Sequence, residues 1–509
     1  MIELSLFPRS PMQWLARRLA VAAGAVALAD WLFFDPFPLG LSLALFLGAG
    51  GLATIVANPI RASMRLRIAA AAALILALLA IVEDVSLLSV LVAVGATLLF
   101  AQVMTFGAGV WPSQLRRASS LPFLGPFWLI GDTLRVRKLS QRGRKTIRRA
   151  ASLVAWIAPI GLLLVFLSLF AVANPVIEEW TRRLDPLRNL DLISPMRILF
   201  WLMMACLTWP FLHLRRSRRM PQRPTPAFAS RKGGDVGALL GRDAVLRSLV
   251  LFNALFALQT SLDMAYLWGG LTLPTGLTYP AYAHRGAYPL LATALLAAGF
   301  VLVAMRPGGP AEDSRYIKPL MLIFVAQNVL LVLSSIFRTA LYVDAYSLTE
   351  LRLSAIIWMG LVTVGLILIV IQIVLRKSNT WLLDANALAA AATLYACCFI
   401  NFPHVVASYN VAHCAETSGA GPALDLYYLR SLGPQAIPAY DQYLRLHAER
   451  TDGGRLPPGS ELPNRAFARF SVTDIDWRSW TFRGWRLKRY FDTYPQGATP
   501  MSDGASENQ

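Results

Sequence analysis

The side chains best suited to bind a charged group lie in the second half of the chain. His284 and Arg285 stand side by side within a run of tyrosines. Arginine can hold a carboxylate or a phosphate through two parallel hydrogen bonds, and histidine titrates near neutral pH. This chemistry predicts a site for an anionic group such as a lipid phosphate. The candidate ligand-binding residues are Asp263, Tyr282, His284, Arg285, Tyr288, Arg338, Asp344, Glu350 and Arg352.

A structural role accounts for the same residues without a ligand. Ionisable side chains at the ends of membrane spans usually pair with each other, because an unpaired charge near lipid is costly. Asp263, Asp344 and Glu350 can pair in this way with the arginines of the same group. In particular, we expect Arg338 to contact Asp344 or Glu350, because only one turn between two spans separates them.

Two further functions remain open. A transporter would need a polar path through its spans, and the residues available for one are Asn253, Gln259, Asp263, Gln327 and Asn328. A membrane-embedded transferase or hydrolase acting on a lipid-linked anionic substrate would use His284 with Asp344 or Glu350. The sequence patterns of phosphate-binding loops, zinc proteases and serine hydrolases are absent, which favours a protein without enzymatic activity.

Metal and cofactor chemistry find little support in the sequence. Three of the four cysteines, Cys206, Cys397 and Cys398, fall in apolar segments. Cys414 has His413 beside it, but two neighbouring residues are too few ligands for zinc. We therefore expect no metal, no cofactor and no disulfide within the C-terminal region.

The segments that carry these residues are long and apolar. Hydrophobic residues make up 56% of the 509 residues and charged residues 15%, whereas a soluble protein has about a quarter charged residues. A helix needs about 20 apolar residues to cross a bilayer. We predict an all-α polytopic membrane protein with about eleven spans and a small α-helical tail. The expected spans are 14–34, 37–57, 68–81, 85–106, 150–173, 196–214, 245–268, 288–305, 320–338, 353–375 and 382–400.

The basic residues of the loops predict on which side each loop lies. Loops rich in arginine and lysine alternate with poorer ones, and basic loops stay in the cytoplasm. One arrangement fits every loop, with the N-terminus cytoplasmic and the C-terminus periplasmic. This arrangement also explains the net charge of +19, so we expect the lipid bilayer, and not nucleic acid, as a partner. Because the chain shows no organelle address, the inner membrane of a bacterium is the expected location.

A basic linker divides the chain. Residues 215–244 are rich in proline, glycine and arginine, which is typical of a flexible cytosolic connection. The expected domains are a front bundle of about six spans at 1–214, this linker, a back bundle of about five spans at 245–400 and the tail at 401–509. Within the front bundle, 107–149 is expected to be either a membrane-surface segment or a plain cytosolic loop, because its apolar part is short and rich in proline. The pair 68–106 is either two full spans or a shorter hairpin.

The tail should contain a helical hairpin and an aromatic, basic segment. Residues 424–432 and 435–449 are helical in pattern, and Gly433–Pro434 ends one helix and starts the next. Residues 474–490 interleave aromatic with basic side chains, which is typical of the bilayer interface. We expect this segment to dock on the outer membrane surface through Trp477, Trp480 and Trp485.

Several stretches resemble a family of bacterial membrane proteins. They are YPAYAHRGAYPL at 279–290, YVDAYSLTELR at 342–352, Asn386, Tyr409–Asn410–Val411 and LDLYYLRSLGPQAIPAY at 424–440. From about 245 to 485 the chain resembles the family of the domain of unknown function 4173. The resemblance implies a polytopic bacterial membrane protein and brings no reaction, ligand or catalytic residue with it.

The leading expectation is an inner-membrane protein that binds a periplasmic ligand or partner, as a transporter-like or sensor component of the envelope. The alternatives are the membrane-embedded enzyme described above, with an anionic lipid as its substrate, and a structural scaffold that assembles with other envelope proteins. A polar cavity at mid-depth would favour transport. A lateral groove beside His284 would favour the enzyme, and a filled bundle with paired charges would favour the scaffold.

Overall fold

The regular structure of this chain is helical. The computed structural model describes residues 11–35, 38–140, 195–214, 241–268, 293, 296–297, 299–301, 315–450 and 476–493. No strand occurs among these residues. The chain forms two compact units: unit 1 comprises 1–220 and 471–488, and unit 2 comprises 221–470 and 489–509.

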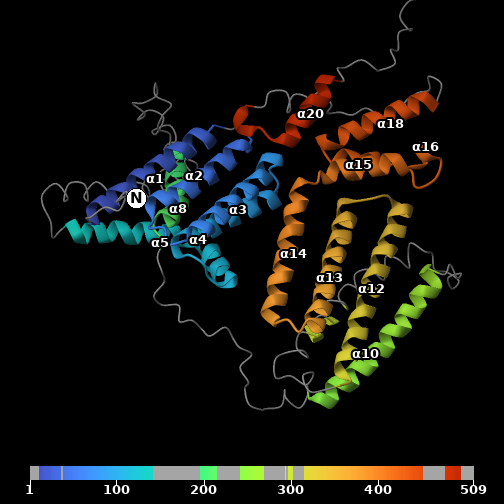
Figure 1. Ribbon diagram of the computed structural model, residues 1–509. Coiled ribbons are helices and arrows are strands. Elements are labelled where there is room, and N and C mark those ends of the chain that lie inside the picture. Colours follow the sequence, from blue (N-terminus) through green and yellow to red (C-terminus); the bar gives the residue numbers. More distant parts are fainter. Residues whose placement is uncertain are drawn as a thin grey trace, which may run out of the picture. The chain divides into compact units, whose positions relative to one another are not determined.

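Unit 1 is a bundle of apolar helices (Figure 1). Its long helices in the described part are α1 (Pro11–Phe33), α2 (Leu41–Ala57), α3 (Met64–Glu83), α4 (Leu87–Phe106), α5 (Trp111–Ser140) and α8 (Pro195–Leu212). Residues 84–86 alone join α3 to α4, and Ser86 caps α4 by accepting a hydrogen bond from the backbone N–H of Ser89. Each helix of this pair has 20 residues, which is long enough for a full span.

Close backbone approaches and buried polar groups hold unit 1 together. A Cβ at Gly125 of α5 would overlap the carbonyl oxygen of Cys206 in α8, so these two helices are in direct backbone contact. At the end of α2, the Nδ2 of Asn58 donates to the carbonyl oxygen of Phe211 at 2.7 Å. Its Oδ1 accepts from the guanidinium of the buried Arg18 at 3.3 Å. Asn58 therefore ties α1, α2 and α8 together at one end of the unit.

Unit 2 consists of long helices with a layer of shorter helices across one end of them (Figure 1). The long elements are α10 (Arg242–Leu262), the π-helix η1 (Asp263–Trp268), α12 (Ile317–Tyr346), α13 (Glu350–Val374) and α14 (Asn379–Phe399). The shorter ones are α15 (Phe402–His413), α16 (Ala415–Ser418), α17 (Leu426–Ser431), η2 (Pro434–Ala436) and α18 (Ile437–Arg450). α10 and α12 begin at the same end of the unit and run in the same direction, whereas α13 runs back (Figure 1).

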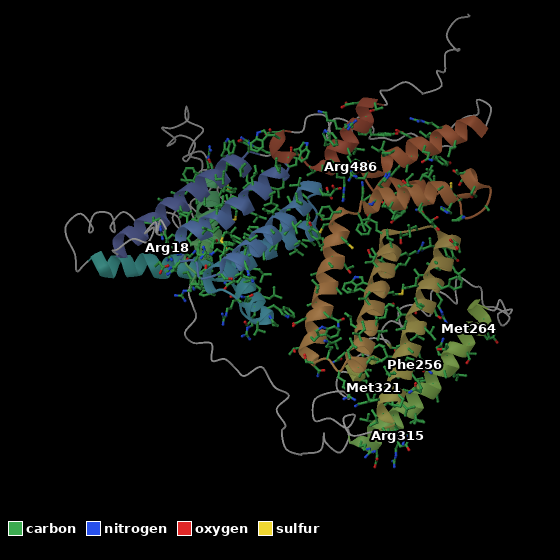
Figure 2. The ribbon with its side chains drawn as sticks, viewed as in Figure 1. Arg18, Phe256, Met264, Arg315, Met321 and Arg486 are labelled. Carbon is green, nitrogen blue, oxygen red and sulfur yellow. The ribbon has the colours of Figure 1, made fainter. Side chains whose placement is uncertain are left out.

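Phenylalanine rings form the centre of the unit 2 core, where α10 meets α12. The rings of Phe256 and Phe324 meet edge to face, with 5.1 Å between their centroids. Phe252 stacks on Phe324 at 5.9 Å. Figure 2 shows Phe256 on α10 and Met321 on α12, within this core. Edge-to-face contacts of this kind add stability beyond the area that the rings bury.

The protein is a multi-pass membrane protein of α-helices. Among the described residues, the helices long and apolar enough to cross a membrane are Met64–Glu83, Leu87–Phe106, Arg242–Tyr266, Ile317–Tyr346, Glu350–Val374 and Asn379–Phe399. Leu41–Ala57 and Met196–Leu212 are shorter apolar helices. The expected span 150–173 and most of 288–305 lie outside the described residues. The expected total of eleven spans and the orientation stay predictions.

α12 is longer than the sequence predicted. The expected span ended at Arg338, but the helix continues to Tyr346 and has 30 residues. At 1.5 Å per residue it measures about 45 Å, more than the bilayer core of about 30 Å. Asp344 therefore lies in the last turn of a helix and not in a loop. The turn to α13 passes through Ser347 at φ +67°, a left-handed conformation that is costly for residues other than glycine.

α5 covers most of the described part of 107–149. The apolar stretch of this segment lies inside one continuous helix of 30 residues, and its place at the membrane surface stays a prediction. Pro122 and Pro126 each remove one backbone hydrogen bond, yet the helix continues because it packs against both α4 and α8. α5 is not among the helices with the length and composition of a span.

The tail is divided between the two units. The predicted hairpin is confirmed by α17 and α18, and Gly433 adopts a φ of +75° in the turn that joins them. These helices belong to unit 2, whereas residues 471–488 belong to unit 1. That second stretch contains the short helix η3 (Trp477–Ser479) and the start of α20 (Phe482–Thr493).

Candidate functional site

The residues of the predicted anion site do not form one cluster in the described part of the chain. Tyr282, His284, Arg285 and Tyr288 lie outside the described residues. The other candidates fall into two groups. Asp263 and Arg338 meet between α10 and α12, whereas Asp344, Glu350 and Arg352 surround the turn from α12 to α13.

Asp263 and Arg338 form a buried ion pair. The guanidinium of Arg338 donates to Oδ1 of Asp263, and the two side chains are 3% and 1% exposed. The Nε2 of Gln259 donates to the same oxygen at 2.9 Å. A buried pair requires such additional hydrogen bonds to offset the loss of solvent. Asp263 is also the first residue of η1, and π-helical turns occur frequently at functional sites.

The expected pairing of Arg338 with Asp344 or Glu350 is therefore wrong. It assumed that the helix ended at Arg338. Because α12 continues, Asp344 lies about 9 Å further along the helix and faces about 120° away. Arg338 and Asp344 are close in sequence but lie on different faces of one helix. Arg338 pairs instead with Asp263, at the end of α10.

The second group of candidates holds the turn between α12 and α13. The guanidinium of Arg352 donates to the carbonyl oxygens of Tyr346 and Ser347 and lies over the ring of Tyr342, 4.5 Å from its centroid. The hydroxyl of Tyr409 donates to Asp344 at 3.3 Å. These contacts stabilise the turn itself. For this group, the structural interpretation of the charges accounts for the geometry without a ligand.

Tail residues complete the same turn. Asn410 of α15 accepts from the backbone N–H of Leu348 at 2.7 Å and donates to its carbonyl oxygen at 2.9 Å. The backbone N–H of Glu350 donates to the hydroxyl oxygen of Tyr428 at 3.0 Å. Burial, followed by the charge of Asp344, raises the pKa of Tyr409. The stretches at 342–352, 409–411 and 424–440, which carried the family resemblance, therefore meet at one place in unit 2.

Side-chain oxygens on the facing elements α10, η1 and α12 are buried without a hydrogen-bond partner among the described residues, and they include Oδ1 of Asn253, Oγ1 of Thr260, Oδ2 of Asp263 and Oδ1 of Asn328. The amide orientations are fixed by chemistry. The Nδ2 of Asn253 donates to the carbonyl oxygens of Leu249 and Leu320, at 2.8 and 3.1 Å. The Nδ2 of Asn328 donates to that of Phe324 at 2.7 Å. A reversed amide would set oxygen against oxygen, so the unfilled atom of each asparagine is its oxygen, a hydrogen-bond acceptor.

These polar groups lie at different depths along α10 and α12. Asn253 contacts α12 at Leu320, near its start, and Asp263 contacts it at Arg338, more than two turns before its end. The rings of Phe256 and Phe324 meet between these two levels. We use the name polar seam for Asn253, Thr260, Asp263, Asn328 and Arg338. The seam has an aromatic contact partway along it.

Two further polar clusters in unit 1, one half-buried and one buried, were not predicted from the sequence. Asp30 of α1 accepts from Arg197 at 2.7 Å and from the indole N–H of Trp201 at 2.8 Å. In α5, Asp132 accepts from the indole of Trp209 at 3.1 Å and contacts His213. A lone aspartate in an apolar helix was the available signal, because such a residue must find a partner on another helix.

The aromatic, basic segment contacts the acidic connections of unit 1. Arg478 reaches Asp35 at 3.1 Å, and Arg483 reaches Asp84 at 2.8 Å. Arg486 contacts Glu83. The indole of Trp477 lies 5.3 Å from that of Trp31. We call this set of contacts the C-terminal clasp. The C-terminal clasp consists of Trp31, Asp35, Glu83, Asp84, Trp477, Arg478, Arg483 and Arg486.

The C-terminal clasp changes the expected role of this segment. Three arginines face Asp35, Glu83 and Asp84, so carboxylates neutralise the charge that was expected to face anionic lipid. Of the three tryptophans expected to anchor the segment, Trp477 is 41% exposed and packs on Trp31, which is 54% exposed. The backbone N–H of Leu41 donates to the carbonyl oxygen of Trp480 at 2.9 Å. The segment therefore binds protein, and docking on the bilayer stays a prediction for its exposed rings.

No cluster of three or more His, Cys, Asp or Glu side chains suited to a metal ion occurs in the part of the chain that the structure describes. Cys206, Cys397, Cys398 and Cys414 are free thiols.

Comparison with known proteins identifies a family. The family model for the domain of unknown function DUF4153 matches residues 70–443, well over half of the chain. The resemblance to family 4173 is thereby corrected. The match begins earlier in the chain than that resemblance, in α3 of unit 1, and ends in α18 of unit 2. No curated protein and no solved structure matches the chain. This multi-pass membrane protein, with its buried Asp263–Arg338 pair, belongs to the DUF4153 family.

Proposed function

We propose that this protein binds a small ligand at the polar seam between α10 and α12, as the binding part of a transporter or sensor. The observation that carries the proposal is Asp263, which is 1% exposed and keeps Oδ2 unfilled. Leaving a buried charged oxygen without its full set of hydrogen bonds costs about 1–3 kcal/mol or more. An ionisable residue in a membrane helix is by default a functional-site candidate.

The order of groups along the seam supports this function. Polar atoms lie on both sides of the contact between Phe256 and Phe324. Apolar constrictions of this kind can gate a path by excluding water. The seam thus has a polar level near Asn253, an aromatic barrier and a second polar level at Asp263. A ligand entering from the side of Asp263 would meet the ion pair before the barrier.

The proposed setting is the inner membrane of a bacterium, with the N-terminus in the cytoplasm. The alternation of basic loops supports this orientation. Under it, α10 and α12 both run outward, and Asp263 lies toward the periplasmic ends of its helices. The ligand would then arrive from the periplasm.

A scaffold is the second candidate, and the observation in its favour is the interlocked tail. Asn410 fixes the turn at Leu348 with two hydrogen bonds, and α15 to α18 share one apolar core with Val343 and Leu348. A rigid helical layer of this kind could present a surface to another envelope protein. The scaffold requires no access to the polar seam, whereas the ligand-binding function does.

Substituted-cysteine labelling separates the two functions without knowledge of the ligand. In a full-length variant without its four native cysteines, Thr260→Cys and Asn328→Cys are introduced one at a time. We expect both to react with a small, charged, membrane-impermeant thiol reagent. Leu330→Cys is the matched control, because Leu330 is 47% exposed on the outer surface of α12, where lipid and not water surrounds it.

Labelling of Thr260→Cys and Asn328→Cys above the Leu330→Cys level supports a seam that water and small solutes reach. If all three variants remain equally unreactive while the protein stays folded, the seam is closed, the proposed function is wrong and the scaffold is favoured.

A further inference from the structure

We propose that the polar seam binds a monovalent metal cation, held by Oδ2 of Asp263 and the hydroxyl of Thr260. This inference rests on the proposed function and names the class of its ligand. It replaces, for this part of the protein, the anion expected from the sequence.

The hydroxyl of Thr260 is the observation that locates the site. Threonines inside helices commonly donate to the carbonyl oxygen four residues earlier. Thr54, Thr97 and Thr339 do so at 3.0, 2.8 and 2.9 Å. The hydroxyl of Thr260 is buried and finds no partner among the described residues. Its rotamer therefore leaves the oxygen available to a ligand.

Thr260 and Asp263 are placed to share one ligand. Residues three apart on a helix have Cβ atoms about 5–6 Å apart on the same face. Both Oγ1 of Thr260 and Oδ2 of Asp263 are unfilled acceptors, so one ion can contact both. The backbone N–H of Asp263 is shared between the carbonyl oxygens of Gln259 and Thr260 at the start of η1. These two carbonyl oxygens are therefore occupied, and the atoms that remain for a ligand are the carboxylate oxygen of Asp263 and the hydroxyl of Thr260.

The chemistry of these atoms selects the charge of the ligand. Carboxylate and hydroxyl oxygens bind hard cations, and the carboxylate repels anions. Asp263 is already paired with Arg338, so the site is neutral before an ion binds. A monovalent cation adds one net charge in a medium of low dielectric constant, whereas a divalent cation adds two at a higher cost. Gln259 and Arg338 are positioning residues, because both hold Oδ1 and leave Oδ2 to the ion.

Cation-dependent thermal stability of the purified full-length protein tests the inference. Unfolding is followed in sodium chloride, potassium chloride or choline chloride at equal ionic strength. We expect sodium or potassium to raise the midpoint by about 2–5 °C over choline, because a ligand that binds only the folded state stabilises it. Thr260→Val should abolish this rise and leave the midpoint in choline nearly unchanged.

Thr339→Val is the matched control, because its hydroxyl is already bonded to Ser335 within α12. This variant should keep the response to sodium or potassium. Asp263→Asn should lose the response. If Asp263→Asn misfolds, Thr260→Val alone tests the site.

The outcomes separate this inference from the proposed function. If the unfolding midpoint is the same in all three salts, water occupies the polar seam and the proposed cation site is wrong. If the midpoint rises only when the pH is lowered, a proton binds there and the proposed cation site is likewise wrong. If Thr260→Val keeps the full response, the cation binds elsewhere and the assigned site is wrong. The proposed function survives either result as long as Thr260→Cys and Asn328→Cys are labelled.

Discussion

Arg483 lies 2.8 Å from Asp84, although 399 residues separate them in the chain. Arg483 comes from α20 and Asp84 from the connection between α3 and α4. The second contact of Arg483, with Glu83 at 3.5 Å, joins the same connection. Residues 471–488 therefore belong to the same compact unit as the N-terminal helices.

Reversing the charge at Arg483 should open the C-terminal clasp. Arg483→Asp places a carboxylate against Glu83 and Asp84, and we expect a loss of about 1–3 kcal/mol and faster tryptic cleavage before α20. The double variant Arg483→Asp with Asp84→Arg should recover part of that loss. No recovery in the double variant, measured by thermal unfolding and proteolysis, would show that the pair contributes no stability.

The C-terminal clasp also predicts topology. Residues 35, 84 and 483 must lie on one side of the membrane, opposite the start of α1 if α1 crosses it. We expect a periplasm-active reporter to work after Pro495 and a cytosol-active reporter to work after Arg376. A cytosolic reporter that works after Pro495 would contradict both the orientation and the odd number of spans.

Asn410 should be required for the turn between α12 and α13. Asn410→Asp keeps the acceptor for the N–H of Leu348 but sets an oxygen against its carbonyl, so we expect a loss of about 1–3 kcal/mol. Tyr427→Phe is the control, because Tyr427 is 84% exposed. The two variants are compared by thermal unfolding, and equal midpoints would exclude a structural role for the Asn410 amide.

Two glycines of α5 should respond in opposite ways to the same substitution. Gly125→Ala should destabilise unit 1 by about 1–3 kcal/mol, because the new Cβ overlaps the backbone of Cys206. At Gly131 nothing lies within 4 Å of the added Cβ, and alanine is favoured over glycine by about 0.5–1 kcal/mol in a helix. Thermal unfolding of both variants checks the contrast. A stable Gly125→Ala variant would place α5 further from α8.

The tail helices should become less stable at high pH. Burial is the main cause that raises the pKa of both Tyr440 and Tyr443 above their ordinary value. The folded state thus favours the neutral phenol. The resulting stability is complete below the ordinary value of about 10 and is lost as the pH rises through the raised pKa. Tyr443→Phe, which cannot ionise there, should reduce this alkaline loss in circular-dichroism melts recorded across the range. An unchanged pH profile in Tyr443→Phe would assign the loss to other groups.

The membrane class, the helical structure and most of the helix positions could be predicted from the amino-acid sequence. These follow from local physics, because an apolar stretch of about 20 residues can satisfy its backbone in lipid only as a helix. α13 and α14 accordingly lie within a few residues of the predicted spans. The turn at Gly433 was also readable, because glycine and proline restrict the backbone locally.

The contacts between distant side chains could not be predicted from the sequence, because they depend on how the helices pack. Asp263 and Arg338 are 75 residues apart, and their pairing depends on where α12 ends and which faces of α10 and α12 touch. The sequence predicted that Asp263 pairs with an arginine, but several arginines were available as the partner. The aromatic, basic pattern around Arg483 likewise predicted only a position at the bilayer interface. The contact between Arg483 and Asp84 follows from the return of the chain end to unit 1, which depends on long-range packing that no local pattern encodes.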